Sequence, residues 1–125
     1  MAREKWKIIF YQKVDGSSPV YDFIESLTPK LNAKIYRDIG VLQDYGNTNR
    51  EPYSKYLDDG IFELRTKQGR DITRVLYFFY IGNIIVLTNG FIKKTAKTPG
   101  KEIRLAKAYR KDFLSRMEVE SDVDF

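Results

Sequence analysis

Four basic residues carry the candidate chemistry of this chain: Arg65, Arg74 and the adjacent pair Lys93 and Lys94. A guanidinium can grip a phosphate with two donors and stabilise the charge that builds on it in a transition state. A lysine among arginines has a lowered proton affinity, so a fraction of it can act as a base near neutral pH. The chain contains no histidine and no cysteine. Together, these residue types would allow RNA to be cleaved by its own 2′-hydroxyl.

Positive charge gathers in the last third of the chain. The formal net charge is +5, yet nine basic residues lie between Lys93 and Arg116 against two acids, Glu102 and Asp112. This distribution implies an anionic partner, which would be nucleic acid, the ribosome or an acidic protein. A solvated basic helix face is the alternative interpretation. Lys55, Lys67, Lys97 and Lys101 are the further candidates for contact with RNA or the ribosome.

Strand geometry brings the two arginines together. If Lys67 and Ile72 close a four-residue loop, counting outward pairs Arg65 with Arg74 on the same side of the sheet. Like charges directly opposite are unfavourable, and a fold accepts them more readily when an anion sits between them. The next hairpin, turning at residues 82–83, would place Arg74 near Phe91 and bring Lys93 or Lys94 beside the arginines. The alternative is that Arg65 pairs with Glu63 or Asp71 and that Arg74 is a rim charge.

The elements that must position these side chains follow from periodicity and turn residues. Ser18-Pro19 and Thr28-Pro29 each predict a helix start, and the glycine at position 46 predicts the end of the second helix. Residues 6–11, 54–57, 61–67, 72–80 and 84–92 read as strands, with a bulge expected at Gly90. A third helix is expected from Thr98-Pro99 to about Ser115. The order predicts an α+β domain: a small curved antiparallel β-sheet with an N-terminal αα-hairpin and a C-terminal helix.

Composition limits the remaining possibilities. At 125 residues with 42% apolar content, we expect a single domain over residues 1–117 and a flexible acidic tail over 118–125. The first residues lack an apolar export segment, and no apolar run approaches the length of a membrane span, so a cytoplasmic protein is expected. The absence of cysteine excludes disulfides and thiolate metal sites. Asp58-Asp59 fits a turn better than a metal site, and we expect neither a metal nor a cofactor.

Three blocks of sequence carry a family resemblance. They are Gly60–Arg65 (GIFELR), Thr73–Phe78 (TRVLYF) and Asn89–Pro99 (NGFIKKTAKTP). In this order they resemble the phage-derived, HigB-like branch of the RelE/ParE toxin superfamily. The likeness also takes in Phe23–Leu27 and the helix that ends at Tyr45-Gly46, so it spans roughly residues 5 to 114.

The resemblance implies the toxin of a type II toxin–antitoxin system, which enters the ribosomal A site and cuts mRNA during translation. It implies a RelE-like fold, and it assigns the functional positions to Arg65, Arg74, Lys93 and Lys94. It also implies a partner, a helix-turn-helix antitoxin. Relatives in the RelE branch often carry a tyrosine or histidine near the end of the last element. Here that position offers Tyr109, which core packing explains equally well.

Two other functions remain open at this point. One is a ParE-like inhibitor of DNA gyrase, since the two branches share a fold and fold does not fix function. The paired arginines and the lysine pair favour the nuclease, because an inhibitor needs no phosphate-centred catalytic patch. The other is a non-catalytic phage protein whose basic face docks RNA or an acidic partner.

Overall fold

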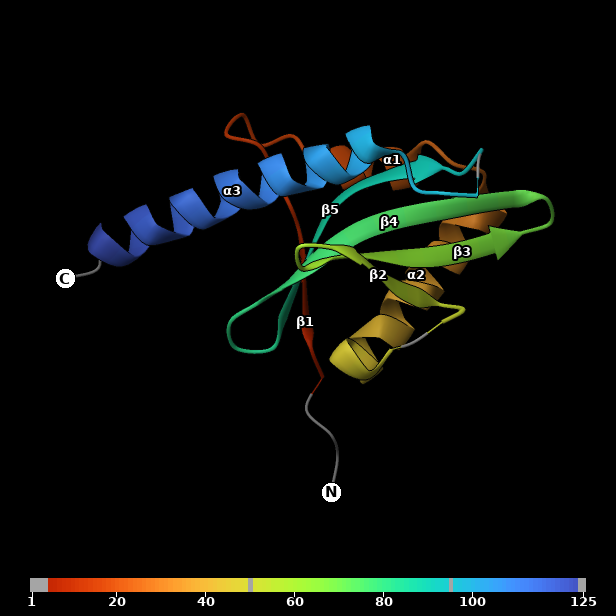
Figure 1. The fold of residues 1–125 in the computed structure, drawn as a ribbon, viewed down its shortest axis with the longest axis horizontal. Helices are drawn as coiled ribbons and strands as arrows, with labels where there is room; N and C mark the ends of the chain where they lie inside the picture. The colour runs from red at the N-terminus through yellow and green to blue at the C-terminus, as the bar shows by residue number, and fades with distance from the viewer. Residues whose placement is uncertain (1–4, 50, 95, 124–125) are drawn as a thin grey trace, which may run out of the picture.

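The computed structural model describes residues 5–49, 51–94 and 96–123, with side chains described up to residue 118. Within these residues, a five-stranded sheet is flanked by three α-helices (Figure 1). The α+β class, the two N-terminal helices and the C-terminal helix are confirmed. In chain order the elements are β1 (Lys7–Phe10), α1 (Pro19–Glu25), α2 (Pro29–Tyr45), the 3-10 turn η1 (Gly46–Thr48), β2 (Ser54–Asp58), β3 (Ile61–Gln68), β4 (Asp71–Tyr80), β5 (Ile84–Ile92) and α3 (Gly100–Val123).

The sheet is mixed, whereas the sequence predicted an antiparallel one. Its strand order is β1-β5-β4-β3-β2, and β1 runs parallel to β5 with Ile8 opposite Ile85. The other neighbouring pairs are antiparallel. Short hairpins join β2 through β5 and force antiparallel pairing, but β1 is connected to the sheet through α1 and α2. A connection that contains helices permits a parallel pair.

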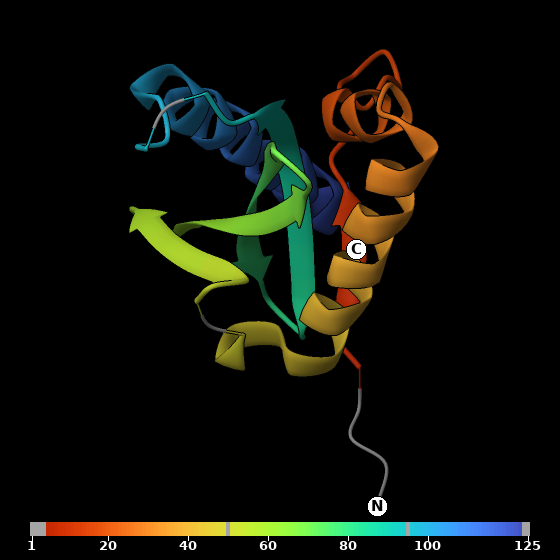
Figure 2. The ribbon, with the colours of Figure 1, turned by 90° about the vertical axis from the view of Figure 1, so that its right-hand side faces the viewer.

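Helices lie on both faces of the sheet, α1 and α2 on one and α3 on the other (Figure 2). Alternate side chains of the strands contribute to a hydrophobic layer on each face. Leu64, Val75 and Tyr77 pack with α1 and α2 on one face. Leu76 and Phe78 pack on the other face with Ala106 and Phe113 of α3 and with part-buried Tyr109. The period of two along β4 therefore fixes which face each residue serves. Arg74, two residues before Leu76, therefore belongs to the face of the sheet that α3 covers.

The predicted helix starts are confirmed. Ser18 caps α1 by accepting a hydrogen bond from the Tyr21 amide at 3.3 Å, and Thr28 caps α2 by accepting from the Leu31 amide at 3.4 Å. The third helix differs, since it begins at Gly100 and continues to Val123. No glycine or proline interrupts residues 116–123, so nothing in the backbone ends the helix at Ser115. The predicted tail thus begins as helix; residues 124 and 125 lie outside the described residues, and its flexibility stays a prediction.

The pairing of β4 with β5 differs from the prediction in two ways, and their effects on the register cancel. Tyr80 faces Ile84 across a three-residue loop, where a two-residue loop was predicted. The register then shifts by one between Leu76 and Tyr77, because Thr88 is an extra residue in β5. The bulge therefore lies at Thr88, and the expectation of a bulge at Gly90 is wrong. The two shifts offset each other, so Arg74 still faces Phe91 as predicted.

Gly90 has a packing role. A Cβ atom at this position would lie 2.4 Å from Cδ2 of Phe23, the α1 ring that presses against β5. Gly40, by contrast, sits inside α2 with open space around its Cβ position. The two glycines thus form a matched pair for a stability test.

We predict that Gly90→Ala lowers the free energy of unfolding by about 1–3 kcal/mol, because the added methyl group overpacks the contact with Phe23. Gly40→Ala should raise it by roughly 0.5–1 kcal/mol, since alanine is the better residue within a helix. Urea denaturation of the two variants and the parent measures both changes. Equal stabilities for Gly90→Ala and the parent would contradict the packing role.

None of the described helices combines the length and the apolar character needed to cross a membrane.

Candidate functional site

Arg65 and Arg74 face each other across β3 and β4, as the strand count predicted. The Glu63 carboxylate lies between them. Its Oε1 atom accepts a hydrogen bond from Nε of Arg65 at 3.0 Å and another from Nη1 of Arg74. Its Oε2 atom accepts from the hydroxyl of Thr98, in the segment before α3. The anion that the facing arginines require is thus supplied by the chain itself. Of the alternatives, the Arg65–Glu63 pairing is present, but Arg74 is no rim charge.

The three charged residues of this cluster differ in how deeply they are buried. Glu63 is fully buried and Arg74 is 3% exposed, whereas the side chain of Arg65 retains a quarter of its exposure. Burial lowers the pKa of Arg74 and the charge of Arg65 lowers it further, while Glu63 opposes both effects. One carboxylate faces two guanidiniums, so the cluster keeps a positive charge. Among the described residues, none accepts a hydrogen bond from the buried Nε of Arg74.

Lys93, and not Lys94, joins the arginines. The Lys93 amide extends the β4–β5 ladder by donating to the carbonyl of Ile72 at 2.7 Å, and its side chain lines the same recess as Arg65 and Arg74. Lys94 is exposed and lines none of the recesses described here. Desolvation lowers the pKa of Lys93, and the charges of Arg74 and Arg65 lower it further. The geometry thus distinguishes between two lysines that the sequence could not separate.

Two recesses meet at the arginine pair. The first, about 370 Å³ in volume, is bordered by Arg65, Arg74, Lys93 and Lys67, together with side chains of α2. It exists because the β2–β3 ladder ends at Ser54 opposite Leu64 while β3 continues to Gln68. Beyond that point, side chains from both faces of the sheet reach one edge.

The second recess, about 260 Å³, lies between β2 and the segment that leads into α3. Lys55 and Lys97 border it, again with Arg65 and Arg74. Of the four predicted RNA-contacting lysines, Lys67 therefore lies at the first recess and Lys55 and Lys97 at the second. Lys101 is exposed on the first turn of α3 and borders neither.

Sequence reasoning missed the contribution of α2. Lys34 and Arg37 border the first recess, and so does Tyr53 from the segment before β2. Basic residues recur on α2 at helical spacing, which indicates a basic helix face. The sequence alone does not show that this face lies beside the β3–β4 hairpin. Tyr109, the candidate near the end of the chain, stacks on Tyr11 with ring centroids 4.6 Å apart and belongs to the α3 core.

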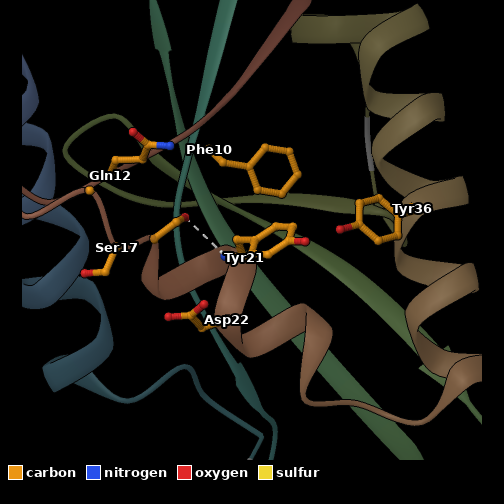
Figure 3. Close-up of a pocket in the computed structure, with 8 residues that line it drawn as sticks. Phe10, Gln12, Ser17, Tyr21, Asp22 and Tyr36 are labelled. Atoms are coloured by element: carbon orange, nitrogen blue, oxygen red, sulfur yellow. Dashed lines mark hydrogen bonds between the residues drawn. The ribbon is translucent and has the colours of Figure 1, made fainter.

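A larger recess of about 560 Å³ lies apart from the arginines, between β1, α1 and α2 (Figure 3). Phe10, Tyr21 and Tyr36 surround it, with Asp22 at its margin. Neither lysine nor arginine is among the described residues that line it. This recess is the larger one, but an anionic ligand would favour the recess at Arg65 and Arg74, where positive charges gather.

The fold and the site define a small α+β domain with a desolvated, cationic recess at one end of its sheet. Residues 22–111 match the family described as phage-derived protein Gp49-like (DUF891). The matched segment covers most of the chain, so this protein belongs to the Gp49-like family. It includes the whole arginine cluster and both lysines of the pair. No curated protein matches the chain significantly.

Glu63 should be the residue on which the stability of this region depends. We predict that Glu63→Gln lowers the free energy of unfolding by about 3 kcal/mol, because it leaves two guanidiniums facing each other without a counter-charge. Adding Arg74→Met to that variant should restore much of the loss by removing the buried cation. Chemical denaturation monitored by circular dichroism measures these differences.

Asp58→Asn is the control, since Asp58 is 60% exposed in its ion pair with Lys107. An exposed pair contributes little, so this change should stay within about 1 kcal/mol of the parent. The role assigned to Glu63 would be untenable if Glu63→Gln proved as mild as Asp58→Asn.

Proposed function

We propose that this protein is the toxin of a type II toxin–antitoxin system and that it inhibits translation by cleaving mRNA on the ribosome. Membership of the phage-derived Gp49-like family supports a toxin role when combined with the likeness to HigB-like toxins in residues 60–65, 73–78 and 89–99. The observation that carries the nuclease assignment is the convergence of Arg65, Arg74 and Lys93 on one recess. Three cations around one cavity match the scissile phosphate of RNA.

The cleavage step needs a base, a charge stabiliser and a leaving group. In the proposed reaction, Lys93 in its neutral form takes the proton from the ribose 2′-hydroxyl. The 2′-oxygen then attacks phosphorus, and the bond from phosphorus to the 5′-oxygen breaks. The products are a 2′,3′-cyclic phosphate and a 5′-hydroxyl, whose proton comes from water. The hydroxide left behind takes up the proton that Lys93 carries, which restores the neutral amine. Arg65 and Arg74 stabilise the charge on the phosphoryl oxygens during the step.

The two arginines would act differently. Arg65 is partly exposed and can turn a donor toward a phosphate. Arg74 is held by Glu63 and is almost fully buried, so it contributes positive charge and no direct contact. A charge fixed in a desolvated place stabilises a transition state more than a mobile charge in water does. The accompanying partners in this proposal are the ribosome, mRNA and a helix-turn-helix antitoxin, all in the cytoplasm.

Arg65→Ala is the most informative variant, because it leaves Glu63 and Arg74 as a balanced pair. We predict that expression of the parent arrests growth and produces new mRNA ends, and that Arg65→Ala reduces cleavage by about 10²–10³-fold. Lys111→Ala removes an equal charge from an exposed position on α3 and should retain full activity. Growth curves and mapping of transcript ends provide the measurements.

Growth arrest with intact transcripts would exclude the nuclease. If the purified protein then inhibited DNA supercoiling by gyrase, the function would be that of a ParE-like inhibitor. Loss of cleavage in Lys111→Ala to the same extent as in Arg65→Ala would show that overall charge, and not the recess, is responsible.

The pH dependence of cleavage tests Lys93. Only the neutral amine accepts a proton, and its population grows as pH approaches the lowered pKa of Lys93 from below. The single-turnover rate on isolated ribosome complexes, corrected for spontaneous hydrolysis, should rise with pH and level off above that pKa. Lys93→Arg should abolish the rise and slow cleavage by about 10²–10⁴-fold, since a guanidinium stays protonated. An unchanged pH profile in Lys93→Arg would assign the base elsewhere.

A further inference from the structure

Three recesses follow one another along one side of α2. The first recess, bordered by Arg65, Arg74 and Lys93, shares Lys34 and Arg37 with another recess nearer the start of the helix. It shares Arg37, Asp38 and Tyr53 with a third toward the end of the helix. The shared residues place the three recesses in a row along α2, here called the trough, and the candidate catalytic residues border the middle one.

The spacing along α2 explains the trough. Lys30, Lys34, Arg37, Val41 and Tyr45 recur at intervals of three or four residues, which places them on one face of the helix. From Lys30 to Tyr45 this face runs roughly 22 Å, at about 1.5 Å per residue. A trough of this length suits an extended strand better than a single small molecule.

The chemistry changes from one end of the trough to the other. Toward the start of α2 the walls are basic, with Lys30, Lys34 and Arg37. Toward the end they are aromatic, because Tyr45 and Tyr53 line a recess of about 350 Å³ together with Val41. Both rings are about half exposed, at 53% and 54%. Cations followed by accessible aromatic rings form the pattern that binds single-stranded nucleic acid, with phosphates on the former and bases on the latter.

Asp38, the acid among the described residues that line these recesses, is largely neutralised. Its Oδ2 atom accepts a hydrogen bond from Thr66 at 2.7 Å, and Nη2 of Arg37 lies 3.6 Å from its Oδ1. The carboxylate is also mostly buried. It therefore repels an incoming phosphate weakly, and Arg37 borders the same recess as the two tyrosines.

We propose that the recess between Tyr45 and Tyr53 is a nucleobase subsite, which holds the base of the nucleotide next to the scissile phosphate. This inference rests on the proposed function, because it takes the ligand to be RNA. The phosphate to be cut lies at Arg65, Arg74 and Lys93, and Tyr53 borders both that recess and the next. The base stacks on the tyrosine rings, while Arg37, which borders both recesses, adds positive charge beside the backbone of that nucleotide. Stacking would orient the RNA for in-line attack without a requirement for one particular base.

The test compares two probes, a fluorescent hexa-adenylate with 2′-O-methyl riboses, which cannot be cleaved, and a sugar–phosphate chain of equal length without bases. Binding to the full chain is followed by fluorescence anisotropy. The parent should bind the hexa-adenylate more tightly than the baseless chain. Tyr53→Ala and Tyr45→Ala should each weaken binding of the hexa-adenylate by about 5- to 150-fold and leave binding of the baseless chain unchanged.

Three controls make the result specific. Tyr53→Phe keeps the ring and should bind like the parent. Tyr21→Ala removes an equally exposed ring from the recess of Figure 3, which contains no described cation, and should also bind like the parent. Arg65→Ala should weaken both probes, because it acts on the phosphates.

The outcomes separate the two proposals. If Arg65→Ala weakens both probes but the tyrosine variants bind the hexa-adenylate like the parent, the nucleobase subsite is refuted and the RNA-binding function stands. If neither probe binds, or if Arg65→Ala has no effect on either, the nucleobase subsite is refuted, whereas the ribosome-dependent function is decided by the mapping of transcript ends.

Discussion

The carboxylate of Glu63 is the interaction on which this region depends. It is fully buried and holds two guanidiniums and the Thr98 hydroxyl at once. Without it, the register that sets Arg65 against Arg74 would oppose like charges in a desolvated place. Through Thr98 it also ties the segment before α3 to the strands, so the second recess owes one wall to the same group. A single acid therefore fixes the pairing, the burial of Arg74 and the approach of α3.

The same arrangement provides the surplus charge that a ligand can meet. Two guanidiniums share one carboxylate, and Lys93 adds a third cation whose pKa is lowered by desolvation and then by that surplus charge. Nearby acids do not cancel it, since Asp38 is occupied by Thr66 and Arg37. The β3–β4 turn lies at the opposite end of the molecule from the C-terminal end of α3 (Figure 1). Much of the basic charge that the sequence places on α3 is thus remote from the recess, and strand register matters more than total charge.

Local signals in the sequence predicted the parts of the fold that depend on local chemistry. The Ser18-Pro19 and Thr28-Pro29 caps and the Arg65–Arg74 register are of this kind. The sequence did not predict features that depend on contacts between distant segments. These are the parallel pairing of β1 with β5, the packing of Gly90 against Phe23 and the side chains that α2 contributes to the first recess. The pairing of Arg74 with Phe91 was predicted correctly only because two errors in the prediction cancel. The loop is one residue longer than expected, and the bulge lies at Thr88. Each error alone would have moved the side chains of β5 to the opposite face.

Arg74 belongs to the scaffold and to the candidate site at the same time, which limits what its removal can reveal. Its replacement by alanine would leave the Glu63 carboxylate with one partly exposed cationic partner, so the fold and the function would be disturbed together. Arg65 and Lys93 lack this ambiguity, because both border the recess and neither is fully buried. Glu63 holds both arginines, but only Arg65 keeps part of its side chain exposed at the recess. The difference in burial between the two facing arginines therefore leaves one guanidinium accessible in a 125-residue chain that contains no histidine.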